Sequence, residues 1–382
     1  MTGTNSHPRP ARMRLRGVLD EAVRNLASGT SHACAMAVTL ACLMMLCVTA
    51  DLASITAIQR QADSFVASGG STYSITYTGH IDGAACDRLV SLDGVIAAGA
   101  VRGTAGKLTF AALPSTGVPT YEVTTGATGV FANSTTAARD AVRPDAARSG
   151  VWLSQEAAKP LGVRAGGRVT LRDDRTVDVA GVYDWPDDGR QSGYSYAAIT
   201  PVPASDDEPF DQCWVKAWPV PENLESLLRV TTMGDESATQ ERPTVAQLNT
   251  TQGRTFDAIA AYRGRLTAWA PLVAGVVALL VGWIAVHLRR LELASALHCG
   301  VPKPAMVAGV LVETGVWALI AIAMCTPALA WMWLANTDAD AMVLTDTLLR
   351  VPAAAYVGVF VGALARAATI RERQLFRYFK NR

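Results

Sequence analysis

The chain has 382 residues, of which half are hydrophobic, and its 34 basic and 33 acidic side chains leave a formal net charge of +1. A nearly neutral balance gives no bulk electrostatic indication of a nucleic-acid partner. The length suffices for two or three domains, and the apolar content is high for a purely soluble protein.

The N-terminal residues 1–32 are basic and carry apolar side chains at helical spacing. This pattern predicts an amphipathic helix on the inner membrane surface, formed by Leu15, Val18, Leu19, Ala22, Val23 and Leu26. The arginines, the apolar segment after them and the "VTA" ending at Ala50 also resemble a secretory signal peptide. A basic region of about 32 residues is unusually long for a signal peptide, so we favour an uncleaved first span.

Four apolar segments are long enough to cross a bilayer, whose hydrocarbon core requires about 20 mostly apolar residues. They cover residues 33–57, 266–288, 305–335 and 351–370. A single segment of this kind could be a buried helix of a soluble protein, but four favour a multi-pass membrane protein.

Basic residues indicate how these spans are oriented, because Lys and Arg are enriched on the cytoplasmic side. They precede the first span, lie in the 289–304 segment, and recur in the tail 371–382, whereas the 336–350 loop carries aspartates. We therefore expect a protein of the bacterial plasma membrane. Both termini would lie in the cytoplasm, and residues 58–265 would lie outside.

The external region divides by composition. Segments 71–79 and 94–103 are typical of strands around a short helix, and 211–218 reads as a further strand followed by a helix. Between them, residues 114–204 are rich in turn-forming residues. Within this region we expect a strand that ends at Leu153 and a helix that is capped by Ser154 and ended by Gly162. Two strands around the "DDR" turn should follow. The prediction is an extracytoplasmic α+β domain, in which a split α/β subdomain carries an inserted β-rich subdomain.

Two cysteines, Cys86 and Cys213, lie in the external region, one in each half of the split subdomain. An oxidising compartment permits a disulfide between them, but sequence does not give their distance, and whether they are bridged stays open.

No recognisable catalytic or cofactor motif occurs. The segment "GTAGKLT" at Gly103 fails the phosphate-loop pattern, because Val101 stands where the first Gly is needed and Leu108 follows Lys107. No metal-ligand spacing is found either. We therefore expect neither an enzyme nor a bound cofactor or metal.

The segment Leu288–Val316 combines charge, turn and membrane carboxylate at fixed intervals. Arg289 and Arg290 are followed by Glu292, Gly300 comes eight residues later, and Glu313 thirteen beyond that. These intervals, the 150–185 segment and the one-plus-three order of spans resemble the FtsX-like ABC transporter permeases, which include MacB-type exporters and lipoprotein-releasing permeases. The resemblance covers nearly the whole chain.

What the resemblance implies is a permease subunit whose 289–304 segment docks on a separate ATP-binding subunit. The residues expected to carry this coupling are Arg289, Arg290, Glu292, Gly300 and Lys303; a solvated basic loop is the alternative. The family's long helices pass ATP-driven motion to the external domain, and residues 53–65 and 251–265 could extend the first two spans as such stalks. Leu297, Cys299, Pro302 and Pro304 depart from the family pattern, which puts the identity of the ATPase in doubt.

Two charged residues lie inside the predicted spans, namely Glu313 in the third and Arg366 in the fourth. Such residues usually face the bundle interior, so we hypothesise a Glu313–Arg366 contact, within the chain or across a dimer. The alternative places Arg366 at the interface and bonds Glu313 to backbone or hydroxyl groups.

The predicted fold is thus a membrane α-helical protein of four spans with an external α+β domain. The predicted function is mechanical transmission in an ABC complex, with membrane lipid, an ATPase and a second permease copy or subunit as partners. Export, lipoprotein handling and control of a cell-wall enzyme are all compatible with it. The alternative is a membrane-anchored sensor or scaffold that binds a ligand outside the cell without ATP.

Overall fold

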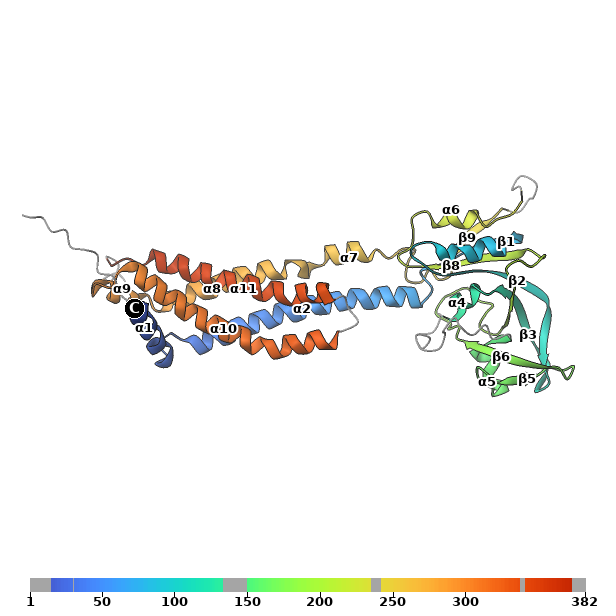
Figure 1. The fold of residues 1–382 in the computed structure, drawn as a ribbon, viewed down its shortest axis with the longest axis horizontal. Coiled ribbons are helices and arrows are strands. Elements are labelled where there is room, and N and C mark those ends of the chain that lie inside the picture. Colours follow the sequence, from blue (N-terminus) through green and yellow to red (C-terminus); the bar gives the residue numbers. More distant parts are fainter. Residues whose placement is uncertain (1–14, 30, 133–149, 235–241, 337–340, 373–382) are drawn as a thin grey trace, which may run out of the picture. The chain divides into compact units, whose positions relative to one another are not determined.

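The computed structural model describes residues 15–29, 31–132, 150–234, 242–336 and 341–372. The predicted features at residues 1–14, part of the inserted subdomain at 133–149, Asp338, Asp340 and the basic tail 373–382 lie outside these ranges. The chain forms two compact units, shown in Figure 1. The helix unit comprises Met1–Ile58 and Ile259–Arg382, and the sheet unit comprises Gln59–Ala258.

The helix unit is built from long apolar helices. In chain order its elements are α1 (Leu15–Ala27), α2 (Ala33–Ala67), α7 (Ala258–Gly264), the 3-10 turn η3 (Leu266–Trp269), α8 (Ala270–Leu288), α9 (Arg290–His298), α10 (Lys303–Ala335) and α11 (Ala341–Thr369). Four stretches are long and apolar enough to cross a membrane: Ala33–Ala67, Leu266–Leu288, Lys303–Ala335 and Ala341–Thr369. The one-plus-three arrangement of apolar helices is therefore confirmed.

Glycines bring α8 and α11 into close backbone contact. A Cβ added at Gly362 would lie 1.9 Å from the carbonyl oxygen of Leu279, and one added at Gly358 would lie 2.2 Å from that of Gly275. Small residues allow such approach, which favours van der Waals packing between membrane helices. The pair is therefore held by shape rather than by charge along most of its length.

Two helices of the helix unit have bounds that differ from the expected secondary structure. The loop expected at 336–350 is helical from Ala341, since α11 begins ten residues before the predicted span; the acidic residue Asp346 lies on this added helix. The stalk expected at 251–265 contains only the seven-residue α7. Gly253, with a φ of +95°, precedes that helix, and Arg265 follows it in an extended conformation.

In the sheet unit, nine strands of the described residues form one mixed sheet of order β5-β6-β4-β7-β3-β2-β8-β1-β9. The strands are β1 (Thr72–Ile81), β2 (Val95–Phe110), β3 (Leu113–Thr124), β4 (Val151–Ser154), β5 (Arg168–Thr170), β6 (Thr176–Tyr183), β7 (Ala198–Val202), β8 (Phe210–Ala217) and β9 (Thr244–Gln247). Short helices accompany them: α3 (Gly83–Arg88) with the 3-10 turn η1 (Leu89–Ser91), α4 (Ala127–Ala132), α5 (Gln155–Leu161) and α6 (Leu224–Arg229). Strands β3 to β7 of the predicted insertion occupy one end of this order.

Local signals in the insertion were read correctly. Ser154 caps α5 by accepting a bond from the Ala157 amide at 3.3 Å, and Gly162 ends the helix in the left-handed region with a φ of +63°. Strands β5 and β6 flank the predicted turn. Cap and turn residues act on backbone groups only a few residues away, which is why sequence alone specifies them.

Cys86 on α3 and Cys213 on β8 are joined by a disulfide, with a Cα–Cα distance of 5.8 Å. Both side chains are fully buried in a cluster with Ile75, Phe210 and Leu228. The bridge closes a sequence separation of 127 residues, so it ties the two halves of the predicted split subdomain together.

Candidate functional site

The connection between α8 and α10 is a short helix followed by a glycine turn. Leu293 and Ala294 of α9 are buried, whereas Glu292, Ser295 and His298 are exposed. Gly300 has a φ of +89°, a conformation that side chains rarely adopt. The helix therefore presents one polar face to its surroundings, and Gly300 turns the chain back into α10.

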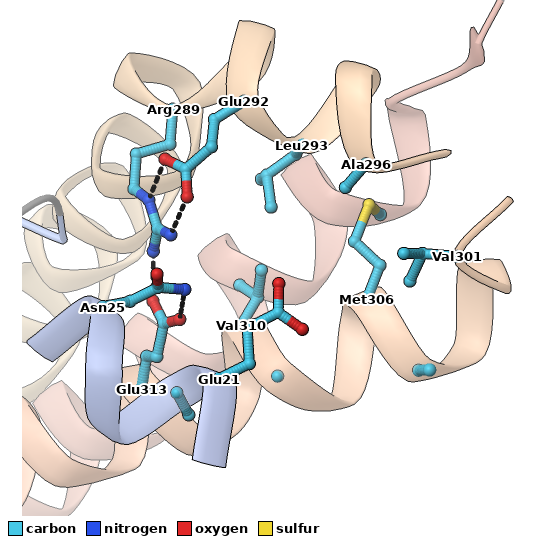
Figure 2. Close-up of a pocket in the computed structure, with 13 residues that line it drawn as sticks. Glu21, Asn25, Arg289, Glu292, Leu293, Ala296, Val301, Met306, Val310 and Glu313 are labelled. Carbon is cyan, nitrogen blue, oxygen red and sulfur yellow. Dashed lines mark hydrogen bonds and ion pairs between the residues drawn. The ribbon is translucent and has the colours of Figure 1, made fainter. Parts of the chain in front are cut away.

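A buried ionic network anchors the start of this connection (Figure 2). Arg289 donates to Glu292 at 3.0 Å and 2.7 Å and also to the Glu313 carboxylate of α10. The other oxygen of Glu313 accepts a bond of 2.8 Å from the Asn25 amide of α1. One carboxylate thus joins three segments that are distant in sequence.

Because this network is buried, its ion pair holds the start of α9 in place. Glu313 is 5% exposed and Arg289 is 9% exposed. Burial alone would lower the pKa of the Arg289 guanidinium, but the hydrogen bonds and charges of Glu292 and Glu313 outweigh it and raise that pKa. Arg289 therefore stays charged, and loss of either carboxylate would leave a poorly compensated buried cation.

The other predicted coupling residues lie near the exposed face of α9. The Arg290 guanidinium contacts His287 Nε2 at 2.9 Å, and Lys303 donates to the Ala368 carbonyl of α11 at 2.8 Å. The Glu292 side chain is 46% exposed. Arg289 makes its contacts within the chain, so among the charged predicted residues Arg290, Glu292 and Lys303 reach the surface.

The predicted contact between Glu313 and Arg366 is absent within this chain, and the contact across a dimer stays a prediction. Glu313 pairs with Arg289, which the connection after α8 brings over α10. Arg366 lies over the Trp283 ring at 5.4 Å and donates to Thr369 Oγ1 at 2.8 Å. The alternative of a backbone or hydroxyl partner for Glu313 was also wrong, since it bonds to Asn25 and Arg289.

A second buried ionic cluster was missed by sequence reasoning. Asp51 of α2 has a fully buried side chain that accepts from Arg265 at 3.2 Å and pairs with Arg350 of α11. The Arg265 guanidinium also lies 3.8 Å from the Tyr262 ring centroid. A lone acid inside the first apolar segment was the available signal, because such a charge requires a partner.

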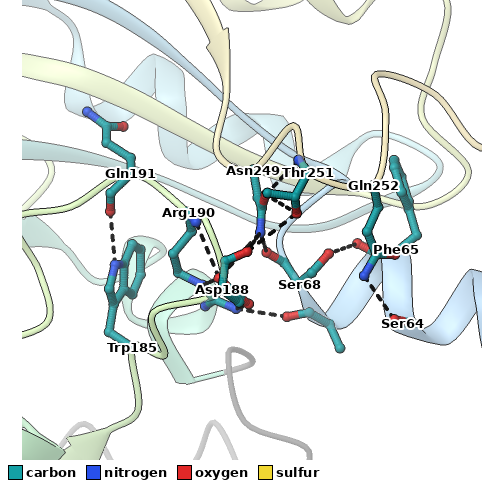
Figure 3. A network of polar contacts seen from close by, with 11 residues as sticks. Ser64, Phe65, Ser68, Trp185, Asp188, Arg190, Gln191, Asn249, Thr251 and Gln252 are labelled. Carbon is teal, nitrogen blue, oxygen red and sulfur yellow. Dashed lines mark hydrogen bonds and ion pairs between the residues drawn. The ribbon is translucent and has the colours of Figure 1, made fainter.

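In the sheet unit, a polar network holds the end of α2 (Figure 3). Arg190 donates to the Ala67 carbonyl at 3.2 Å, and the Asn249 amide donates to the Ser68 carbonyl at 3.0 Å. Asp188 lies between them, accepting from Arg190 at 2.7 Å and from Asn249 at 3.3 Å. These bonds satisfy carbonyls that the last turn of a helix leaves without partners.

The network is largely shielded from solvent. The Arg190 side chain is 3% exposed and Asn249 is 2% exposed. Burial would raise the pKa of the Asp188 carboxyl, but the hydrogen bonds and charge of Arg190 outweigh it and lower that pKa. We call Asp188, Arg190 and Asn249 the α2 anchor.

No family model matches the sequence, and no curated relative matches it either. Among solved structures, the chain is similar to the periplasmic region of MacB from Actinobacillus actinomycetemcomitans. The match is 14% identical with a TM-score of 0.33, and it covers 49% of this chain and 94% of that chain. This score is too low to assign the chain to a family.

Proposed function

We propose that the chain is a non-catalytic permease subunit that receives ATP-driven motion from a separate ATP-binding subunit and passes it to its sheet unit. Under this proposal α9 lies in the cytoplasm and the sheet unit outside, in agreement with the basic residues near Arg289 and Arg371. The active assembly would contain a second copy or a second permease subunit.

The observation that carries the proposal is the continuity and anchoring of α2. It is a single 35-residue helix whose first part belongs to the helix unit and whose last nine residues, from Gln59, belong to the sheet unit. Its end is held by the α2 anchor through a partly buried bond to the Ala67 carbonyl and a buried bond to the Ser68 carbonyl. A continuous helix fixed at its end transmits displacement along its axis, whereas a flexible linker would absorb it.

Two buried ionic clusters support the proposal, because they couple neighbouring helices of the helix unit. The Arg289–Glu313 pair links the start of α9 to α10, and Asp51 links α2 to Arg265 and α11. A force applied to α9 would reach α10 through the Arg289–Glu313 ion pair. Breaking this pair would leave desolvated charges without partners, so the two helices should move together.

The test is to purify the tagged full-length chain from its native membranes after crosslinking and to identify its partners by mass spectrometry. We expect an ABC ATPase whose hydrolysis is stimulated by this chain, and reduced recovery of that ATPase with Arg290→Ala plus Glu292→Ala. Ser295→Ala on the same face is the matched control. Recovery of the chain without any ATPase would contradict the proposal and leave the sensor or scaffold function.

A further inference from the structure

Arg366 is a buried cation whose charge is not matched within the described chain. It is 8% exposed, and its Nε atom is buried with no hydrogen-bond partner. Its Nη1 atom donates to the neutral hydroxyl of Thr369. No carboxylate of the described ranges lies within 4.0 Å of it, and residues 373–382 contain no Asp or Glu.

The surroundings of Arg366 are basic. His287 of α8 lies within electrostatic reach of both Arg366 and Arg290, and Arg290 is bonded to His287 Nε2. The acids closest in sequence to Arg290 and Arg366 have other partners, since Glu292 pairs with Arg289 and Glu372 lies 3.1 Å from His298. An anion beside Arg366 would therefore meet a guanidinium group that has no carboxylate of the described residues within 4.0 Å.

The position along the helices identifies the kind of anion. Arg366 lies three residues before the end of α11 at Thr369, about 4.5 Å at 1.5 Å per residue. Trp283, whose ring the guanidinium covers, lies on α8 one turn before His287. Trp and Arg near the ends of spanning helices lie at the depth of lipid headgroups, where phosphate groups are the abundant anions.

We propose that Arg366, with Trp283 beside it, forms a binding site for the phosphate group of an anionic phospholipid at this end of α8 and α11. The guanidinium of Arg366 presents its free Nε–H to a phosphate oxygen, a geometry that suits Arg better than Lys. The cationic headgroup of a zwitterionic lipid would be repelled by the positive charges of Arg366 and Arg290, so the site favours lipids with net negative charge.

The test is a native mass spectrometry titration of the full-length chain in detergent with phosphatidylglycerol, phosphatidylcholine or inorganic phosphate. We expect the wild type to retain phosphatidylglycerol at least tenfold more strongly than phosphatidylcholine. Arg366→Gln should lower the phosphatidylglycerol affinity about tenfold. Arg371 is exposed and lies two residues beyond Thr369. The Arg371→Gln variant removes the same charge there and should change the phosphatidylglycerol affinity less than about twofold.

Equal lipid retention by the Arg366→Gln and Arg371→Gln variants would overturn the proposal. Absence of any preference for phosphatidylglycerol in the wild type would also overturn it, and this measurement does not depend on the folding of a variant. If inorganic phosphate bound and lipid did not, the lipid assignment would be refuted in favour of a free phosphate.

Discussion

The α2 anchor gives the sharpest prediction about how the end of α2 is held. Asn249→Ala removes the amide that donates to the Ser68 carbonyl at 3.0 Å and to the Asp188 carbonyl at 3.1 Å. A buried polar group left without its partner costs about 1–3 kcal/mol. Local opening of the last turn of α2 should become easier by that amount, which corresponds to roughly 5- to 150-fold faster amide exchange.

Hydrogen exchange of the full-length chain, followed by mass spectrometry on peptides covering residues 60–71, measures this opening. The informative amides are those of Ser68 and Gly70, which bond to the Ser64 and Phe65 carbonyls at 2.9 Å each. Peptides from β2 and β8 should keep their wild-type exchange, because they contain none of the removed bonds.

Gln252→Ala is the matched control, since the exposed Gln252 makes one bond of 3.0 Å to Ser64 Oγ near the same turn. Surface substitutions of this kind usually change stability by less than about 0.5 kcal/mol, so exchange should rise about twofold at most. Equal exchange at Ser68 in the Asn249→Ala and Gln252→Ala variants would refute the reasoning, because it would mean that Asn249 does not hold the end of α2.

Three further predictions concern charge, packing and pH. Glu313→Gln should destabilise the folded chain in detergent by about 3 kcal/mol, since the buried Arg289 loses one of two counter-ions; an unfolding midpoint equal to wild type would contradict this. Gly362→Leu should abolish recovery of folded chain, because the new Cβ would lie 1.9 Å from the backbone oxygen of Leu279. Gly315→Ala should be tolerated, because its new Cβ would have its nearest contact at 3.4 Å. The lowered pKa of Asp188 means that its contribution to stability is present above about pH 4, the ordinary value for Asp, and is lost as pH falls through the lower folded value. Amide protection factors at residues 60–71, corrected for the slower intrinsic exchange in acid, should therefore fall below about pH 4, and unchanged factors would contradict this.

The parts of the fold that were predictable depend on local or strongly periodic signals. The apolar runs, the Ser154 cap and the Gly162 stop each act through nearby residues, and the structure places them as expected. The early start of α11 was not predictable from hydropathy, because residues 341–350 mix apolar and polar side chains in a sequence that helices tolerate equally well.

Ionic partners were harder to predict because they depend on how distant helices pack. Hydropathy indicates that Glu313 needs a partner, but it does not give the packing that brings Arg289, the residue between α8 and α9, rather than Arg366 to Glu313. Sequence does not identify Arg265 as a partner of Asp51, because it lies 214 residues away in a segment that is also compatible with a stalk helix. The α2 anchor carried no sequence signal, since Asp188 and Asn249 resemble ordinary turn residues.

The central claim is that ATP-driven motion reaches the sheet unit through α2. The most direct measurement compares hydrogen exchange at residues 60–71 in the crosslinked native complex with bound ATP and with ADP. The account predicts that protection of these amides differs between the two nucleotide states, and that the difference shrinks in the Asn249→Ala variant. Identical exchange in both states, in a complex that hydrolyses ATP, would contradict it.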